Sequence, residues 1–303
     1  MVFQWPSCSE KTPPLHPNLS TSQYQEKFLL TAVIISAPGN FQHREVIRQT
    51  WLQACPVDFK HLFVVGSEGL DSRTMGLISE EMKKHEDLLL LPIHDSYQNL
   101  TSKVLQAITS VLGLLQTDYI LKCDDDSFVQ VVSLMEHLRQ AETPRTKFYW
   151  GFFSGNAKVY RTGRWKEEQW NHCNSYLPYA RGGGYVISHD LGEFLARNKE
   201  DLAQFSSEDV SVGAWLAFVK GLQRVHDRRF DTEYKSRGCW NLYLVTHKQT
   251  TESMVTLWQN LQTQGKLCTQ ESSIMFSYEY NWNVQPSHCC VRNVSDISSS
   301  TLS

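Results

Sequence analysis

The segment Leu-Lys-Cys-Asp-Asp-Asp-Ser-Phe, residues 121–128, follows the apolar residues Tyr119 and Ile120 and places three carboxylates at the end of an apolar run. Adjacent aspartates repel one another and resist burial, so such a cluster at the end of a strand needs a counter-charge. A divalent cation is the usual one. We therefore interpret Asp124, Asp125 and Asp126 as a cation site that can also hold a diphosphate leaving group. The alternative is a solvated turn without function, since aspartate is common in turns.

The apolar runs before this triplet alternate with helical patterns, which predicts an α/β domain with a largely parallel sheet covered by helices. Strands are predicted at 28–36, 61–66, 88–93 and 118–123, and helices at 44–52, 72–85 and 99–115. In such a sheet the ligand crevice lies beyond the carboxyl ends of the strands. Asp95 and the aspartate triplet should emerge there. Beyond the triplet we expect a helix at 131–140, strands at 148–153 and 185–188, and a helix from residue 206 or 207.

The composition limits the kinds of partner and indicates the cellular compartment of the protein. The net charge is −3 and no long basic block is present, so nucleic acid is excluded as a partner. Eight cysteines without a C-x-x-C pair favour disulfides over zinc, and the sequons at Asn18, Asn99 and Asn293 favour the secretory pathway. No apolar stretch approaches the roughly 20 residues of a membrane span, so either export follows another route or an anchor lies outside this sequence. We expect a flexible stem at 1–26, one catalytic domain at 27–292 and a disordered tail at 293–303.

Two features of the sequence are suited to metal binding: the outer carboxylates of the triplet and His247. Asp124 and Asp126 are separated by one residue, so their side chains can share a face of the chain, one binding a metal and the other a ribose hydroxyl or a metal-bound water. His247 follows an apolar run at 242–245, and a neutral imidazole there is a good ligand for manganese or a similar ion. The alternative for His247 is an ordinary surface or core histidine.

Other candidates have ordinary alternatives as well. Glu208 and Asp209 fall in the first turn of a predicted helix, where the helix dipole favours acids, but a transferase also needs a carboxylate across the cleft to accept a proton. Arg44 and Arg48 share a helix face that could grip a diphosphate or simply be solvated. We interpret three further features as ligand contacts: Trp165 and Trp170 as sugar-stacking rather than core residues, and Gly182–Gly184 as glycines whose positive φ lets the backbone approach a ligand.

These motifs occur in an order that resembles the β-1,3-glycosyltransferase family. Five segments carry the resemblance: His-Arg-Glu-Val-Ile-Arg-Gln-Thr-Trp at 43–51, Asp-Ser-Tyr-Gln-Asn-Leu-Thr-Ser-Lys at 95–103, the triplet, Gly-Gly-Gly-Tyr at 182–185 and Glu-Asp-Val-Ser-Val-Gly at 208–213. The family implies a GT-A fold, an inverting mechanism, a UDP-sugar donor, Mn²⁺, and residence in the Golgi lumen as type II membrane proteins.

The resemblance also implies roles for individual residues. The metal would be bound by Asp126 and His247, and Asp209 would be the catalytic base. The remaining assignments are donor contacts at Arg44, Arg48, Asp95, Lys103, Asp124, Asp125, Gly183, Gly184 and Glu208, and acceptor contacts at Trp165, Trp170 and Tyr185.

Motifs at 149–155, 176–180, 230–234, 236–239 and 244–249 resemble the members of the family that build the proteoglycan linkage region. They imply transfer of galactose from UDP-galactose to the 3-hydroxyl of galactose in Gal-β-1,4-Xyl, the galactosyl-xylosyl core of proteoglycans, through a β-1,3 link. Two alternatives stay open. The chain could transfer N-acetylglucosamine or N-acetylgalactosamine instead, or it could be a sugar-binding homologue without catalysis.

Overall fold

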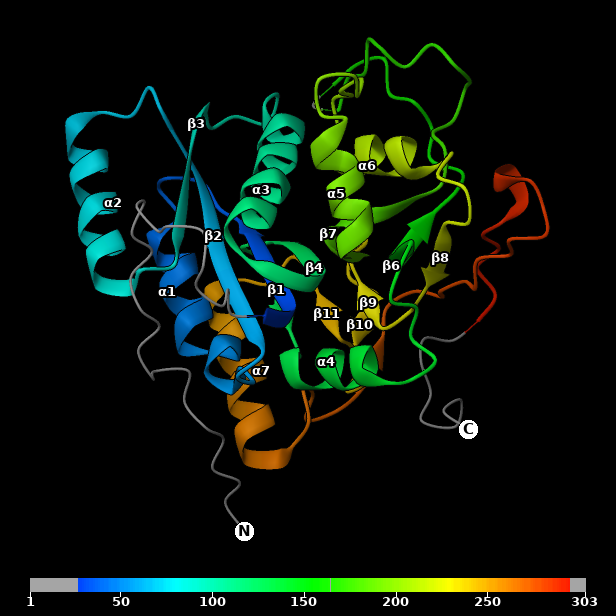
Figure 1. Ribbon diagram of the computed structural model, residues 1–303. Helices are drawn as coiled ribbons and strands as arrows, with labels where there is room; N and C mark the ends of the chain where they lie inside the picture. Colours follow the sequence, from blue (N-terminus) through cyan, green and yellow to red (C-terminus); the bar gives the residue numbers. More distant parts are fainter. Residues whose placement is uncertain (1–26, 164, 295–303) are drawn as a thin grey trace.

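A computed structural model describes residues 27–163 and 165–294, and a seven-stranded sheet with the order β3-β2-β1-β4-β7-β6-β8 forms its centre (Figure 1). Neighbouring strands from β3 to β4 are parallel, β7 is antiparallel to both β4 and β6, and β8 is parallel to β6. Within this sheet, therefore, only β7 runs against the others. The strands are β1 (Lys27–Ile35), β2 (Phe59–Glu68), β3 (Leu88–His94), β4 (Gln116–Asp124), β6 (Phe148–Ser154), β7 (Tyr179–Ser188) and β8 (Gln223–His226).

Helices cover both faces of this sheet (Figure 1). The side chains of β1 alternate between two cores, with Ala32 and Ile34 in one and Val33 and Ile35 in the other. Burial on both faces explains why the predicted strands are almost continuously apolar, and the predicted mostly parallel α/β sheet flanked by helices is confirmed. The first core includes residues of α1 (Phe41–Gln49), α4 (Val131–Arg139) and α7 (Thr251–Gln264), and the second includes residues of α3 (Leu100–Leu114), α5 (His189–Arg197) and α6 (Glu208–Leu216). Helix α2 (Ser72–His85) has the predicted bounds.

The helix predicted at 44–52 begins earlier and ends earlier. Helix α1 spans Phe41–Gln49, and a short 3₁₀ turn, η1 (Trp51–Ala54), follows it. At the boundary the Thr50 hydroxyl donates to the Val46 carbonyl at 2.7 Å and its N–H donates to the Ile47 carbonyl. These bonds tighten the last turn and end the α-helix.

The glycine triplet lies inside a strand and not in a loop. Strand β7 runs through Gly182–Gly184, and none of the three has a positive φ, which corrects that part of the prediction. Their small size matters for another reason. A Cβ on Gly183 would lie 2.5 Å from the His247 ring, and one on Gly184 would lie 2.8 Å from the Val245 side chain. The glycines therefore let β7 pass directly against the segment that carries His247.

A small three-stranded sheet with the order β5-β11-β9 brings that segment to the main sheet. Strand β11 (Val245–Thr246) pairs antiparallel with β5 (Phe128–Val129), which begins two residues after the aspartate triplet, and parallel with β9 (Phe230–Asp231). Strands β10 (Gly238–Cys239) and β12 (Ser272–Ser273) form a two-stranded ladder, and η2 (Pro286–His288) lies near the C-terminus.

Disulfides are present, as predicted, and they join Cys239 to Cys268 and Cys289 to Cys290. In residues 27–163 and 165–294 no helix has the length and apolar character needed to cross a membrane. The predicted stem, the sequon at Asn18 and residues 295–303 of the predicted tail lie outside the described residues.

Candidate active site

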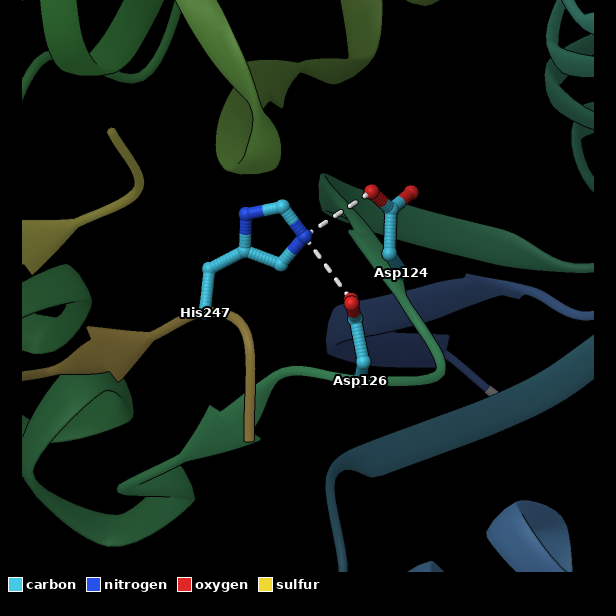
Figure 2. A group of neighbouring side chains, drawn as sticks. All are labelled: Asp124, Asp126 and His247. Atoms are coloured by element: carbon cyan, nitrogen blue, oxygen red, sulfur yellow. Dashed lines mark ion pairs between the residues drawn. The ribbon is translucent and has the colours of Figure 1, made fainter. Parts of the chain in front are cut away.

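Asp124, Asp126 and His247 converge at the carboxyl end of β4 (Figure 2). The Nε2 atom of His247 lies 2.8 Å from Oδ1 of Asp126 and 3.4 Å from Oδ2 of Asp124, and the possible ligand atoms of the three side chains all lie within 4.8 Å of one another. Backbone pairing holds this arrangement, because Gln249 donates to the Asp126 carbonyl at 2.8 Å. Residues more than 120 positions apart in the sequence thus form one cluster.

The cluster fits a divalent cation. Two carboxylates and one imidazole form a mixed oxygen and nitrogen donor set, and His247 Nδ1 is buried without a hydrogen-bond partner. Burial opposes protonation of His247, but hydrogen bonds with Asp124 and Asp126 outweigh it and raise the pKa of the imidazole. A site that attracts a proton so strongly has the negative potential to attract a metal ion, and the Asp124–Asp126–His247 group can hold one.

Asp125, by contrast, faces away from this cluster. Its Oδ2 accepts a hydrogen bond from Asn40 Nδ2 at 2.9 Å, and its Oδ1 lies 3.7 Å from His43 Nδ1. Its backbone N–H donates to the Ile35 carbonyl at 3.1 Å. The middle carboxylate of the triplet is therefore held against the loop before α1, on the side of the predicted donor residues.

Lys122, which no sequence motif singled out, connects the cluster to Glu208 at the start of α6. Its buried Nζ lies 2.8 Å from Oδ1 of Asp124, 2.6 Å from the Gly182 carbonyl and 3.1 Å from Oε1 of Glu208. Burial opposes the charge on Lys122, but the attraction of Asp124 and Glu208 outweighs it and raises its pKa. A lysine two residues before Asp124 in an apolar strand was the available signal, because residues i and i+2 share a face.

The two acids at the start of α6 differ in environment. Glu208 is buried, and burial raises its pKa to about 7 in spite of Lys122. Asp209 is half-buried, its Oδ2 accepts the N–H of Gly182 at 3.0 Å, and burial raises its pKa as well. Gly182 is next to Gly183, which contacts His247, so β7 runs between the possible cation ligands and the acids of α6.

Arg44 and Arg48 share a face, as predicted, but the structure corrects their interpretation as a diphosphate clamp. Arg44 is fully buried, and its Nε and Nη2 donate to Glu81 at 2.8 and 2.7 Å. Arg48 donates to both oxygens of Asp87, at 2.7 and 2.8 Å, and to Glu81 at 2.8 Å. These buried ion pairs join α1 to α2 and to the residue before β3, and they engage both guanidinium groups.

Asp95 and Lys103 lie at the strand ends where the crevice was expected. Lys103 Nζ donates to Oδ2 of Asp95 at 2.6 Å and to the Ser36 carbonyl at 2.8 Å, and the same Asp95 oxygen accepts the Gly66 N–H. The pair thereby ties together the carboxyl ends of β1, β2 and β3. Contact of these residues with UDP stays a prediction.

Two of the three predicted acceptor residues are core residues, which corrects their assignment. Trp170 is 1% exposed and packs on Tyr176 and Phe205, while Tyr185 is fully buried against Tyr149. For Trp170, the polar neighbours in the sequence concealed this burial. Trp165, however, is 36% exposed. Of the predicted glycosylation sites, Asn293 is exposed and the Asn99 amide donates to the His94 carbonyl at 2.9 Å.

Comparisons with known proteins find similar glycosyltransferases. The model of the galactosyltransferase family matches residues 42–228. Mouse β-1,3-galactosyltransferase 6 is 46% identical over 272 residues, which cover 88% of this chain and 83% of that protein. The UDP-GalNAc:β-1,3-N-acetylgalactosaminyltransferase 2 of Xenopus laevis is 31% identical over 195 residues, covering 64% of this chain and 39% of that protein. Among solved structures, a mannosyltransferase from Pyrobaculum calidifontis in complex with GDP-Man and Mn²⁺ aligns with a TM-score of 0.39 at 11% identity, covering 67% of this chain and 55% of that one.

Proposed function

The chain belongs to the galactosyltransferase family, and we propose that it moves galactose from UDP-galactose to the 3-hydroxyl of a β-galactose acceptor, with Gal-β-1,4-Xyl of the proteoglycan linkage region as that acceptor. One observation carries the proposal. A possible metal site, Asp124, Asp126 and His247, is joined through Lys122 to Glu208 of α6, the neighbour in sequence of Asp209. A transferase that uses a nucleotide-sugar donor needs both parts, one for the diphosphate and one for the acceptor proton.

Asp126 and His247 would hold Mn²⁺, and Asp124, fixed by Lys122, would face the nucleotide side. When bound, the cation supplies positive charge that neutralises the departing diphosphate. The protein contributes a rigid arrangement, because the ligands are fixed by backbone pairing between β5 and β11 and by the close approach of Gly183. A rigid site needs little reorganisation when the negative charge develops.

Asp209 is the proposed base. The acceptor 3-hydroxyl oxygen forms a bond to the anomeric carbon from the face opposite UDP, the bond between that carbon and the UDP oxygen breaks, and the hydroxyl proton passes to Asp209. This single displacement inverts the anomeric carbon. The Gly182 N–H orients one Asp209 oxygen, and the raised pKa makes the carboxylate a stronger base than an exposed aspartate.

Transfer of N-acetylgalactosamine is the second candidate, because the Xenopus relative carries that activity in its name. For location we propose the Golgi lumen, with a type II membrane protein as the native form. The disulfides between Cys239 and Cys268 and between Cys289 and Cys290 support an oxidising compartment.

The test is a transfer assay with the purified protein. UDP-galactose, UDP-N-acetylglucosamine and UDP-N-acetylgalactosamine are offered with Gal-β-1,4-xyloside, with Mn²⁺ and with a chelator, and the linkage of the product is assigned by NMR. We expect a β-1,3-linked galactose product that depends on Mn²⁺. Transfer of an N-acetylhexosamine in place of galactose contradicts the proposal, and Asp209→Asn serves as the inactive control.

A further inference from the structure

Three large aromatic side chains form an exposed group, and only one of them, Trp165, has been assigned a role above. Tyr160 is 54% exposed, Trp165 36% and Tyr234 64%. Trp165 contacts both tyrosines, with ring centroids 6.0 Å from Tyr160 and 5.4 Å from Tyr234. We call these three residues the aromatic platform. Its members come from segments about 70 residues apart, so their contact is a feature of the tertiary structure and not of local sequence.

The segment that carries Tyr160 and Trp165 is fixed to the helix of the proposed base. Glu167, which is 1% exposed, donates its N–H to the Tyr160 carbonyl at 2.8 Å. Its carboxylate accepts the N–H of Ser206 at 2.7 Å, and Ser206 lies two residues before α6. The same carboxylate also accepts the N–H of Gln169 at 2.7 Å. This side of the platform is therefore positioned relative to Asp209.

The segment that carries Tyr234 is fixed to the other half of the site. Tyr234 follows β9, which pairs with β11, and the His247 N–H donates to the Asp231 carbonyl at 3.0 Å. The preceding residue, Glu233, is 5% exposed and held by an ion pair with Arg292. Tyr234 is therefore positioned relative to the possible cation site, and the platform connects the two halves of the proposed active site.

The platform also lies apart from the predicted donor residues at the ends of β1 to β4. Asp95, Lys103 and the triplet follow or contact the ends of β1 to β4, whereas the platform belongs to the connection between β6 and β7 and to the segment after β9 (Figure 1). Aromatic faces exposed beside a site suit pyranose rings, since the C–H face of a sugar is apolar and its hydroxyls stay hydrated at the edges.

We propose that Tyr160, Trp165 and Tyr234 bind the sugar ring of the acceptor that follows the attacked galactose, so that the enzyme distinguishes a disaccharide acceptor from a single galactoside. The inference rests on the proposed function and extends it to acceptor length. The attacked galactose sits at Asp209, and the next ring stacks on the platform. Trp165 is the central contact because it touches both tyrosines.

The experiment compares Trp165→Ala and Tyr234→Ala with the native protein on two acceptors, Gal-β-1,4-xyloside and a galactoside with no second sugar. For the disaccharide we expect KM to rise about tenfold, equivalent to about 1.4 kcal/mol of binding. The KM for UDP-galactose and all constants for the single galactoside should stay unchanged. Tyr234→Phe keeps the ring and should restore the native KM. Phe218→Ala is the matched control, because Phe218 is 87% exposed but follows the opposite end of α6.

Saturation-transfer NMR of the disaccharide on the protein without donor gives a second measurement that does not need turnover. Loss of the signals from the second ring in Trp165→Ala supports the platform. If the native protein transfers no galactose, the proposed function is wrong. The NMR signals still show whether the aromatic platform binds the second sugar ring. An unchanged disaccharide KM with unchanged NMR signals overturns the platform alone. Equal losses on both acceptors also overturn it, since they indicate a purely structural role or a protein-binding surface.

Discussion

Lys122 and Asp124 form an ion pair across one residue of β4, with the buried Nζ 2.8 Å from Oδ1 of the partly exposed aspartate. The same ammonium group lies 3.1 Å from Glu208, so one positive charge faces two carboxylates from different elements. Removal of the lysine leaves Asp124 and the buried Glu208 without their counter-charge. The pair is therefore a structural link between the possible cation site and the proposed base helix.

We predict that Lys122→Met lowers the free energy of unfolding by about 3–5 kcal/mol, the usual cost of breaking a buried pair. Urea unfolding at pH 7 measures the change. The double variant Lys122→Met/Glu208→Gln should recover part of the lost free energy of unfolding, because it removes one of the two carboxylates that have lost their counter-charge. A single variant as stable as the native protein contradicts the link.

Asp209→Asn should lower kcat by about 10²- to 10⁴-fold, the range that a general base contributes, and leave UDP affinity within about twofold. Asparagine has nearly the same shape and can still accept the Gly182 N–H, so the fold should persist. Transfer assays and calorimetry with UDP test the two halves of the prediction. Retained galactose transfer would show that another group accepts the proton.

Asp126→Ala should abolish the Mn²⁺ dependence of UDP binding, because it removes a ligand atom that lies 2.8 Å from His247. Asp125→Asn is the matched control, since Asp125 is a neighbouring acid that pairs with Asn40 and not with His247. Electron paramagnetic resonance of Mn²⁺ titrated into each variant measures ion binding directly. Equal loss of Mn²⁺ from both variants argues against the assignment of ligands.

Gly183→Ala should weaken Mn²⁺ binding while the protein stays folded. The added methyl would lie 2.5 Å from the His247 ring, and a contact that short must displace the imidazole. Gly76→Ala in α2 is the control, because its methyl meets nothing within 4 Å and alanine should stabilise the helix by about 0.5–1 kcal/mol. Thermal unfolding and Mn²⁺ titration separate the two effects. Native Mn²⁺ affinity in Gly183→Ala would exclude the proposed role of this close approach.

Asp87 should make stability depend on pH in the acid range. Burial raises the pKa of this carboxyl, but His61 and Arg48 outweigh burial and lower it from 3.8 to about 2. The pKa of Asp87 is lower in the folded state than in the unfolded state. The carboxylate therefore contributes its full amount to the free energy of unfolding above pH 3.8, and this contribution is lost as the pH falls through about 2. We expect Asp87→Asn to lower the free energy of unfolding by about 2 kcal/mol at pH 7, since a shift of one pKa unit corresponds to about 1.4 kcal/mol.

The stability difference between Asp87→Asn and the native protein should narrow below pH 3.8, as urea unfolding at several pH values would show. Asp58→Asn removes a more exposed pair with Arg139 and should cost about 0.5 kcal/mol or less at any pH. A constant difference for Asp87→Asn between pH 7 and pH 2.5 is the result that would refute this assignment.

The sequence predicts those features that depend on local patterns. Apolar periodicity located strands β1 to β4, and the charge of the triplet together with an imidazole at a strand end indicated the cluster of Asp124, Asp126 and His247. Partners distant in the sequence were not predictable. The spacing of Arg44 and Arg48 gave their common face correctly, but nothing local shows that Glu81 and Asp87 neutralise them.

Burial of aromatic residues was equally hard to predict. Trp170 and Trp165 have similar polar neighbours in the sequence, yet one packs on Phe205 and the other is partly exposed. Tertiary packing decides between these states, and that depends on segments which the local sequence does not identify.

Glu167 has a consequence for protein engineering. Its carboxylate accepts the N–H groups of Trp170 and Ser206, and its own N–H donates to the Tyr160 carbonyl, so Glu167 links Tyr160 to Trp170 and joins both to Ser206. Because the residue that makes these hydrogen bonds lies inside the segment, the segment can be exchanged between relatives as a unit. Hybrid enzymes that swap residues 155–178 together with their internal glutamate should keep their fold and inherit the acceptor preference of the donor sequence, whereas swaps that omit this residue should not.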